Sequence, residues 1–181
     1  EAKTGGSSLW LLGGESGVGK SRLVDEARTL ALFDGWQVWR GQAAENGNLP
    51  YQLWRDIVPH IALTTVLTDL EAGVLKQIFP DLDSLLDRQI EVVPQSTSAG
   101  NQDRLSLTLV EAIKRQNQPT LILLEDIHWA REGFAPIKLL LNVVDQLPHV
   151  MVIGTFRNDE SPNLPADLPT AELIELDRLN T

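Results

Sequence analysis

Residues 14–21 form the segment of this sequence that is best suited to chemistry. They read Gly-Glu-Ser-Gly-Val-Gly-Lys-Ser and match the pattern G-x-x-x-x-G-K-[ST], after an apolar run and before a helical pattern. Glycines let the backbone N–H groups curl around phosphate oxygens, and the start of a helix adds partial positive charge. Lys20 would then reach the β- and γ-phosphates of a nucleotide, and Ser21 would ligate Mg²⁺. The residues predicted to bind the nucleotide here are Gly14, Glu15, Ser16, Gly17, Val18, Gly19, Lys20, Ser21 and Arg22.

Two acids, Glu125 and Asp126, close a continuous apolar run that begins at Pro119. Such a run predicts a parallel strand buried on both faces, and sheets of this kind bind ligands beyond the carboxyl ends of their strands. One carboxylate would hold Mg²⁺, and its neighbour would orient or activate the attacking water. The order Glu-Asp puts the shorter side chain second, which predicts slow hydrolysis. The alternative is that the two acids only open a loop or cap the next helix.

Thr155 and Arg157 lie at the end of the next predicted strand. In the sheet that we infer, this strand lies beside the acid-bearing strand, so that either residue could sense a γ-phosphate. An exposed arginine at a strand end is common, which is the plain alternative for Arg157. His128 and Trp129 follow the acids directly. Because no second His or Cys is nearby, we expect His128 to pack or form hydrogen bonds rather than bind a metal.

The elements that must position these residues alternate between strands and helices. Strands are predicted over residues 8–13, 36–41, 119–126 and 150–156, and helices over 20–33, 102–115 and 132–146. This alternation indicates an α/β fold with a parallel sheet. Residues 51–86 predict two or three short helices, either part of the core, which we favour, or an insert that binds a partner. The polar residues 92–102 predict a mobile loop.

Composition limits the class of protein. The chain has 181 residues, of which 43% are hydrophobic and 22% charged, so we expect one compact domain over residues 1–181. Fifteen basic against 25 acidic residues give a net charge of −10, which disfavours nucleic-acid binding. No apolar run approaches the ~20 residues that span a membrane, so no membrane partner is expected. The absence of cysteine excludes disulfides and fits a reducing, cytoplasmic compartment.

Three motifs in order resemble one known family over nearly the whole chain. They are residues 14–23, the segment Leu-Ile-Leu-Leu-Glu-Asp-Ile-His-Trp-Ala at 121–130, and Gly-Thr-Phe-Arg at 154–157. Together they resemble the nucleotide-binding domain of STAND signalling ATPases, a branch of the AAA+-related P-loop NTPases, and most closely the Orc1-like AAA modules of large bacterial regulators. The resemblance implies a P-loop NTPase three-layer α/β/α sandwich with a central, mainly parallel sheet and a helical insert.

The resemblance also implies ATP or ADP as ligand, Mg²⁺ as cofactor, and a role for each motif residue. Lys20 and Ser21 take the phosphate and metal roles, Glu125 the Mg²⁺ position, Asp126 the water-orienting position and Arg157 that of a γ-phosphate sensor. Arg131 departs from the family, which often has an acid there. Because Met151 is the only methionine and the family's lid and winged helix are not in the sequence, we expect a piece of a longer polypeptide with weak affinity and little turnover alone.

Three hypotheses for function follow. The leading one is an ATP-dependent switch in a multidomain regulator, which hydrolyses slowly, acts on other domains of the same polypeptide and assembles with other copies when ATP is bound. The second is a nucleotide-binding scaffold that never hydrolyses. The third is a DNA-associated ATPase of the initiator kind, which the net charge opposes. The absence of Asn-Lys-x-Asp argues against a GTPase.

Overall fold

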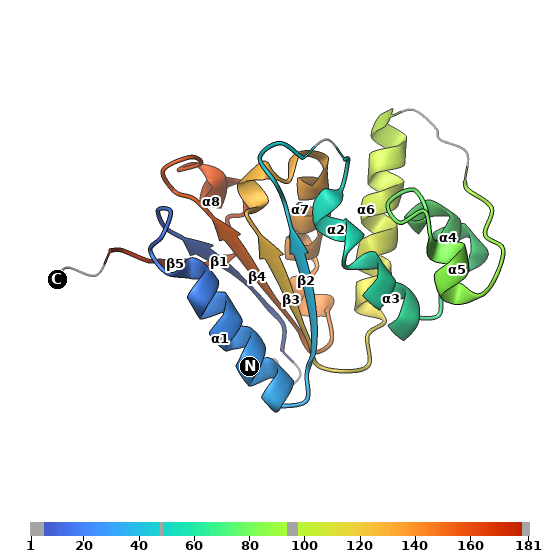
Figure 1. Cartoon of the computed structure of the whole chain (residues 1–181), viewed down its shortest axis with the longest axis horizontal. Coiled ribbons are helices and arrows are strands. Elements are labelled where there is room, and N and C mark those ends of the chain that lie inside the picture. The colour runs from blue at the N-terminus through green and yellow to red at the C-terminus, as the bar shows by residue number, and fades with distance from the viewer. Residues whose placement is uncertain (1–5, 48, 94–97, 179–181) are drawn as a thin grey trace.

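A single parallel sheet forms the centre of the protein. The structure is a computed structural model, and it describes residues 6–47, 49–93 and 98–178. Five strands pair in the order β2-β3-β4-β1-β5, all in parallel (Figure 1). Their bounds are β1 Ser8–Gly13, β2 Gln37–Gln42, β3 Thr120–Glu125, β4 Val150–Phe156 and β5 Glu172–Glu175. Strands β1, β3 and β4 lie side by side, so the three motifs meet at one edge of the sheet.

Helices cover both faces of this sheet, which confirms the three-layer α/β/α sandwich. Helix α1 (Lys20–Phe33) lies over one face (Figure 1), where Val24 packs with Leu121 and Leu123 of β3. The alternate residues of β3, Ile122 and Leu124, belong to a larger core on the opposite face. The helices of that side are α2 Gln52–Arg55, α3 Val58–Thr64, α4 Asp69–Leu75, α5 Leu82–Leu86, α6 Ser98–Lys114 and α7 Phe134–Asn142. Strand β3 is therefore buried on both faces, as its apolar run predicts.

Residues 51–86 form part of the core, as we favoured. They contain the four short helices α2 to α5, where two or three were expected. The prolines explain the division, because Pro59 lies in the first turn of α3 and Pro80 lies between α4 and α5. The side chains of Trp54 and Ile57 are fully buried, together with most other apolar residues of this region. Packing against α6 and β2 thus makes the region structural.

Several predicted boundaries are wrong. The loop expected over 92–102 ends earlier, because α6 begins at Ser98 rather than at residue 102; residues 94–97 lie outside the described residues. Asn101, a polar residue of the stretch that suggested a loop, lies in α6 and donates from Nδ2 to Oε1 of Gln77, in the turn after α4, at 2.9 Å. The helix expected over 132–146 is shorter, since 3₁₀ turns at Arg131–Gly133 and Val144–Gln146 flank α7. The second strand runs over 37–42 instead of 36–41.

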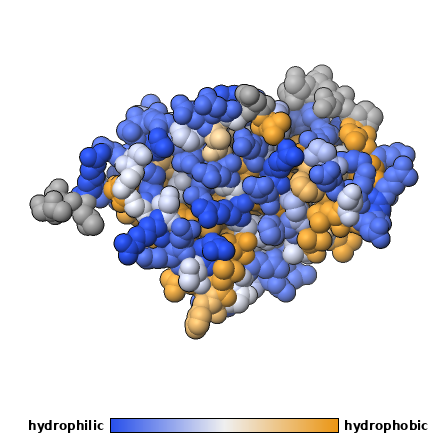
Figure 2. Space-filling model, in the orientation of Figure 1, coloured by the Kyte–Doolittle hydropathy of each residue, from blue (hydrophilic) through white to orange (hydrophobic). Residues whose placement is uncertain are grey.

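Several exposed apolar side chains gather in two groups on the surface. Figure 2 shows a mostly hydrophilic face with apolar groups at its lower tip, where α1 ends and where Leu30, Leu32 and Phe33 are exposed. A second group lies near α3 and α4 and includes Leu63, Val66 and Leu70. In the part of the chain that the structure describes, no helix combines the length and the apolar character needed to cross a membrane.

Candidate functional site

The glycine-rich loop joins β1 to α1, as its sequence predicts. Gly19 is the N-cap of α1 and has a φ of 108°, which glycine adopts without the strain that a side chain would add. No side chain caps the helix, so the N–H groups of its first turn are free for an anion. Ser16 and Gly17 are exposed at the top of the loop. The tip of the loop is thus open to solvent, and its geometry suits phosphate oxygens.

Lys20 is buried in this loop and points back over it. Its Nζ donates to the carbonyl oxygens of Gly14 at 2.5 Å and Glu15 at 2.7 Å. Burial lowers the pKa of Lys20 below its ordinary value, and the positive charge of Arg157 lowers it further, against the nearby acids. The first of those acids is Asp126. Lys20, Asp126 and Arg157 therefore share one electrostatic environment, although they are far apart in the sequence.

The two acids after β3 have different surroundings. Glu125 is the last residue of the strand and is only 5% exposed, whereas Asp126 is partly exposed. Asp126 lies outside the strand with a φ of 55°, an uncommon conformation for a residue other than glycine. Its backbone N–H donates to Thr155 Oγ1 at 3.0 Å, and Thr155 is buried. The hydroxyl of Thr155 thus contacts the backbone beside the acids, which differs from the phosphate contact expected for it.

Strand β2 supplies partners for both acids, and these partners were not predicted. Arg40 Nε donates to Glu125 Oε1, and Arg40 Nη1 lies 3.4 Å from Asp25 Oδ1 on α1. The hydrogen bond to Glu125 is the main reason that the pKa of Arg40 is raised. Gln42 Nε2 donates to Asp126 Oδ2 at 3.1 Å. The only sequence signal for these partners was the weak alternation that predicts a strand over residues 36–41, which contains Arg40 and ends just before Gln42.

Arg157 follows β4 and is held by its own loop. Its Nη1 donates to Glu160 Oε1 at 2.5 Å, and its guanidinium lies 5.0 Å from the centre of the Trp129 ring. Trp129 Nε1 donates to the other oxygen of Glu160 at 3.1 Å. Because β4 lies between β3 and β1, this cluster stands beside the acids and the loop. The adjacency that we inferred for the strand of Arg157 is confirmed.

Two of the predicted loop residues, Arg22 and Glu15, form ion pairs with other residues. Arg22 Nε forms an exposed ion pair with Glu26 at 3.3 Å, and Glu15 Oε2 pairs with Arg178 at 2.9 Å. Val18 is partly buried, and Ser21 is exposed in the first turn of α1. The structure therefore brings Lys20, the acids and Arg157 together, and it leaves Arg22 on the outer face of α1.

The residues present fit a magnesium ion that a nucleotide helps to hold. The available donors are the hydroxyl of Ser21 and the carboxylates of Glu125 and Asp126, all oxygen ligands of the kind that Mg²⁺ prefers. Among the described residues no group of three or more His, Cys, Asp or Glu could hold a metal by itself. This agrees with Mg²⁺ sites that use one or two carboxylates and substrate phosphates. The bond from Arg40 to Glu125 would compete with such an ion.

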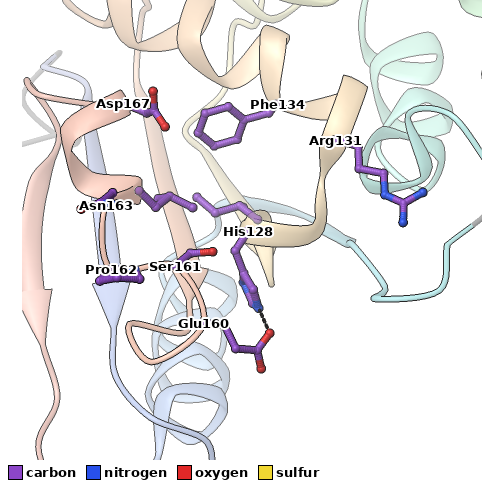
Figure 3. Close-up of a pocket in the computed structure, with 10 residues that line it drawn as sticks. His128, Arg131, Phe134, Glu160, Ser161, Pro162, Asn163 and Asp167 are labelled. Atoms are coloured by element: carbon purple, nitrogen blue, oxygen red, sulfur yellow. Dashed lines mark ion pairs between the residues drawn. The ribbon is translucent and has the colours of Figure 1, made fainter.

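A pocket of about 460 Å³ lies next to the Arg157 cluster, between the turn after β3 and the segment after β4 (Figure 3). His128 and Glu160 are on its wall, and Phe134 and Asp167 lie at its other end. Arg131 also lines the pocket, and its guanidinium points away from the pocket centre in Figure 3. The His128 side chain is 1% exposed, and its Nε2 lies 3.4 Å from Glu160 Oε2 without hydrogen-bond geometry. Its packing role is as expected from the sequence.

The stability of the protein is expected to decrease as the pH falls below about 6.5, in part through His128. Burial lowers the pKa of His128, and Arg157 adds to this, while Asp126 and Glu160 oppose it. Below about pH 6.5 the unfolded chain therefore binds a proton at His128 more readily than the folded chain does. The free energy of unfolding accordingly decreases as the pH is lowered through this range. Urea unfolding at about pH 7.5 and 5.5 measures the loss. His128→Gln should lose less than the wild type, and an equal loss would exclude His128 as the cause.

Comparisons with known proteins agree with this geometry. Residues 1–153 match the family described as AAA ATPase domain. No curated protein matches the sequence. Among solved structures, a chain of Drosophila ORC bound to AT-rich DNA and Cdc6 matches with a TM-score of 0.50 and 12% identity over 94% of this chain and 48% of that chain. A chain of Drosophila ORC bound to DNA matches with a TM-score of 0.51 and 12% identity, over 94% and 79%. The protein spans about half the length of the first of these chains, and at such identities the likeness concerns the fold.

Proposed function

Because the chain belongs to the AAA ATPase domain family and is a nucleotide-binding ATPase domain, we propose that it is an Mg²⁺-dependent ATP switch of the STAND kind. In this role it binds ATP, hydrolyses it slowly, and controls neighbouring domains of one polypeptide or its assembly with other copies. One observation carries the proposal. The three motifs that contain Lys20, Asp126 and Arg157 meet at the carboxyl ends of the neighbouring parallel strands β1, β3 and β4.

Each residue has a role in this proposal. The free N–H groups of the loop and of the first turn of α1 bind phosphate oxygens. Lys20 exchanges its two carbonyl partners for the β- and γ-phosphates. Ser21 and Glu125 would hold Mg²⁺, which neutralises charge on the phosphates when it is bound. Asp126 accepts a hydrogen bond from the attacking water and orients it toward the γ-phosphate.

Slow hydrolysis follows from the contacts of the acids. Asp126 is one methylene shorter than glutamate, and one of its oxygens already accepts from Gln42. Glu125 is bound by Arg40, whose positive charge opposes a metal ion nearby. Slow turnover suits a switch, because the ATP-bound state must last long enough to act. Arg157 supports the switch role, since only ATP has the γ-phosphate that this side chain would contact.

A non-hydrolysing scaffold is the second candidate, and the Arg40–Glu125 pair is the observation that favours it. If Arg40 keeps Glu125 even when nucleotide is present, Mg²⁺ is poorly held and turnover stops. A DNA-associated role has less support. The two Drosophila chains are described as bound to DNA, but this chain carries a net charge of −10.

Calorimetry and phosphate release test the proposal. ATP should bind more tightly with Mg²⁺ than with EDTA, and wild-type protein should release phosphate slowly. Asp126→Asn should keep ATP binding and lower phosphate release at least about tenfold, because an amide cannot accept a proton and orients water less well. Binding without any phosphate release by the wild type would support the scaffold instead. Equal release by wild type and variant would refute the role of Asp126.

A further inference from the structure

Glu160 joins the segment after β4 to the turn after β3. One carboxylate oxygen accepts from Arg157 Nη1 at 2.5 Å, and the other accepts from Trp129 Nε1 at 3.1 Å. His128 Nε2 is 3.4 Å from that second oxygen (Figure 3). His128 and Trp129 belong to the 3₁₀ turn Ile127–Trp129, which begins directly after Asp126. One side chain therefore contacts both the arginine that we assign to the γ-phosphate and the turn beside the acids.

The same contacts fix the direction of the Arg157 guanidinium. Trp129 covers one of its faces, at 5.0 Å from the ring centre, and Glu160 takes its Nη1. The backbone helps, since the N–H of Ser161 donates to the carbonyl oxygen of Arg157 at 2.9 Å and closes the turn that places Glu160. The hydrogen bond to Glu160 uses only Nη1, and no described residue accepts a hydrogen bond from Nε or Nη2 of Arg157. An arginine has five N–H donors, so these nitrogens stay available for an anion.

We propose that Glu160 is the positioning residue that orients Arg157 toward the γ-phosphate of ATP. The proposal rests on the function proposed above. In this role Glu160 does not touch the nucleotide; it holds the guanidinium of Arg157 over the Trp129 ring and leaves the other guanidinium donors for the phosphate. Without Glu160 the long side chain of Arg157 would have to be ordered by the phosphate alone, which costs conformational entropy.

Charge alone predicts the opposite effect, which makes the proposal easy to test. Glu160 is an acid near the phosphate site, and its charge is felt by Lys20. Removing a negative charge should strengthen the binding of an anion such as ATP. Removing a positioning residue should weaken it. The sign of the change in ATP affinity therefore distinguishes the two roles.

The experiment compares Glu160→Gln with Asp159→Asn by calorimetry with ATP and ADP in the presence of Mg²⁺. Asp159 is an exposed acid next in sequence, whose charge also acts on Lys20 and Arg157 and which lacks the contact to Trp129. We expect Glu160→Gln to weaken ATP binding about tenfold and ADP binding less than about twofold, since hydrogen bonds to charged groups contribute at this level. Asp159→Asn should bind ATP as well as the wild type or better. Unchanged or tighter ATP binding by Glu160→Gln would overturn the proposal.

A double-mutant cycle with Arg157→Ala separates this proposal from the proposed function. If Glu160 acts through Arg157, Glu160→Gln adds nothing in the Arg157→Ala background. Additive losses would overturn the positioning role and leave the function intact. If Arg157→Ala itself binds ATP normally, the sensor role fails and the proposal fails with it. Glu160→Ala, which also removes the acceptor for Trp129, repeats the test, and a shift of the Trp129 indole N–H signal on addition of ATP but not ADP is the expected spectroscopic sign.

Discussion

Replacing Lys20 with alanine is expected to lower ATP affinity at least about 100-fold and to leave the fold intact. Lys20 is 9% exposed, and its Nζ has two oxygen partners within the loop that phosphate oxygens would replace. Each charge-assisted hydrogen bond of this kind contributes about 1.5–3 kcal/mol, so the loss of two amounts to about 3 kcal/mol or more. That energy corresponds to at least about a 100-fold change in the dissociation constant, which calorimetry measures directly.

Arg22→Ala is the matched control for this variant. It removes one positive charge from the same turn of α1, but the Arg22 side chain is 86% exposed and pairs with Glu26. Its loss should change ATP affinity less than about threefold, because exposed charges are screened. A similar effect of both variants would mean that general positive charge, and not the contacts of Lys20, governs binding. ATP binding by Lys20→Ala at wild-type affinity would refute the proposed nucleotide site.

The sequence predicts well those features that depend on nearby residues. Strands 8–13 and 150–156 and helix 20–33 agree with the structure at both ends. Apolar runs and glycine-rich turns are local signals, and the motif around Lys20 requires a strand before it and a helix after it. The parallel sheet follows from the alternation of these elements. The predicted helix start at residue 102 and helix end at residue 146 were wrong, because the helices begin at Ser98 and end at Asn142. Partners distant in the sequence and single backbone turns decide where a helix starts or stops.

The partners of the acids could not be predicted for the same reason. Arg40 and Glu125 are 85 residues apart, and Gln42 and Asp126 are 84 residues apart. They become neighbours only because β2 pairs with β3 in a register that sets Gln42 opposite Glu125. The sequence predicts four of the strands and places the strand of Arg157 beside the acid-bearing strand, but it leaves the position of β2 open. The role of Arg40 depends on that position and the role of Glu160 depends on side-chain contacts, so both emerge only from the structure.

Gly41 is the residue at which the fold and the site depend most directly on each other, and Gly41→Ala is expected to destabilise the protein by about 3 kcal/mol or more. A Cβ atom at this position would lie 1.9 Å from the backbone oxygen of Leu53 and 3.1 Å from Ile57 Cδ1. A backbone atom cannot rotate away, so α2 or β2 must move. For a domain of this size the melting temperature should fall by roughly 6–12 °C, which circular dichroism measures.

Gly133→Ala is the matched control, since Gly133 packs against the same helix and has a φ of −66°. A Cβ there would come no closer than 3.5 Å, to Trp54 Cδ1, so stability should change by less than about 0.5 kcal/mol. Gly41 also lies between Arg40 and Gln42, the two residues that hold the acids. Any movement of β2 that relieves the clash displaces both side chains, and phosphate release should therefore change in Gly41→Ala even below its melting temperature. Wild-type stability of Gly41→Ala would show that α2 does not press on β2 as closely as the structure has it.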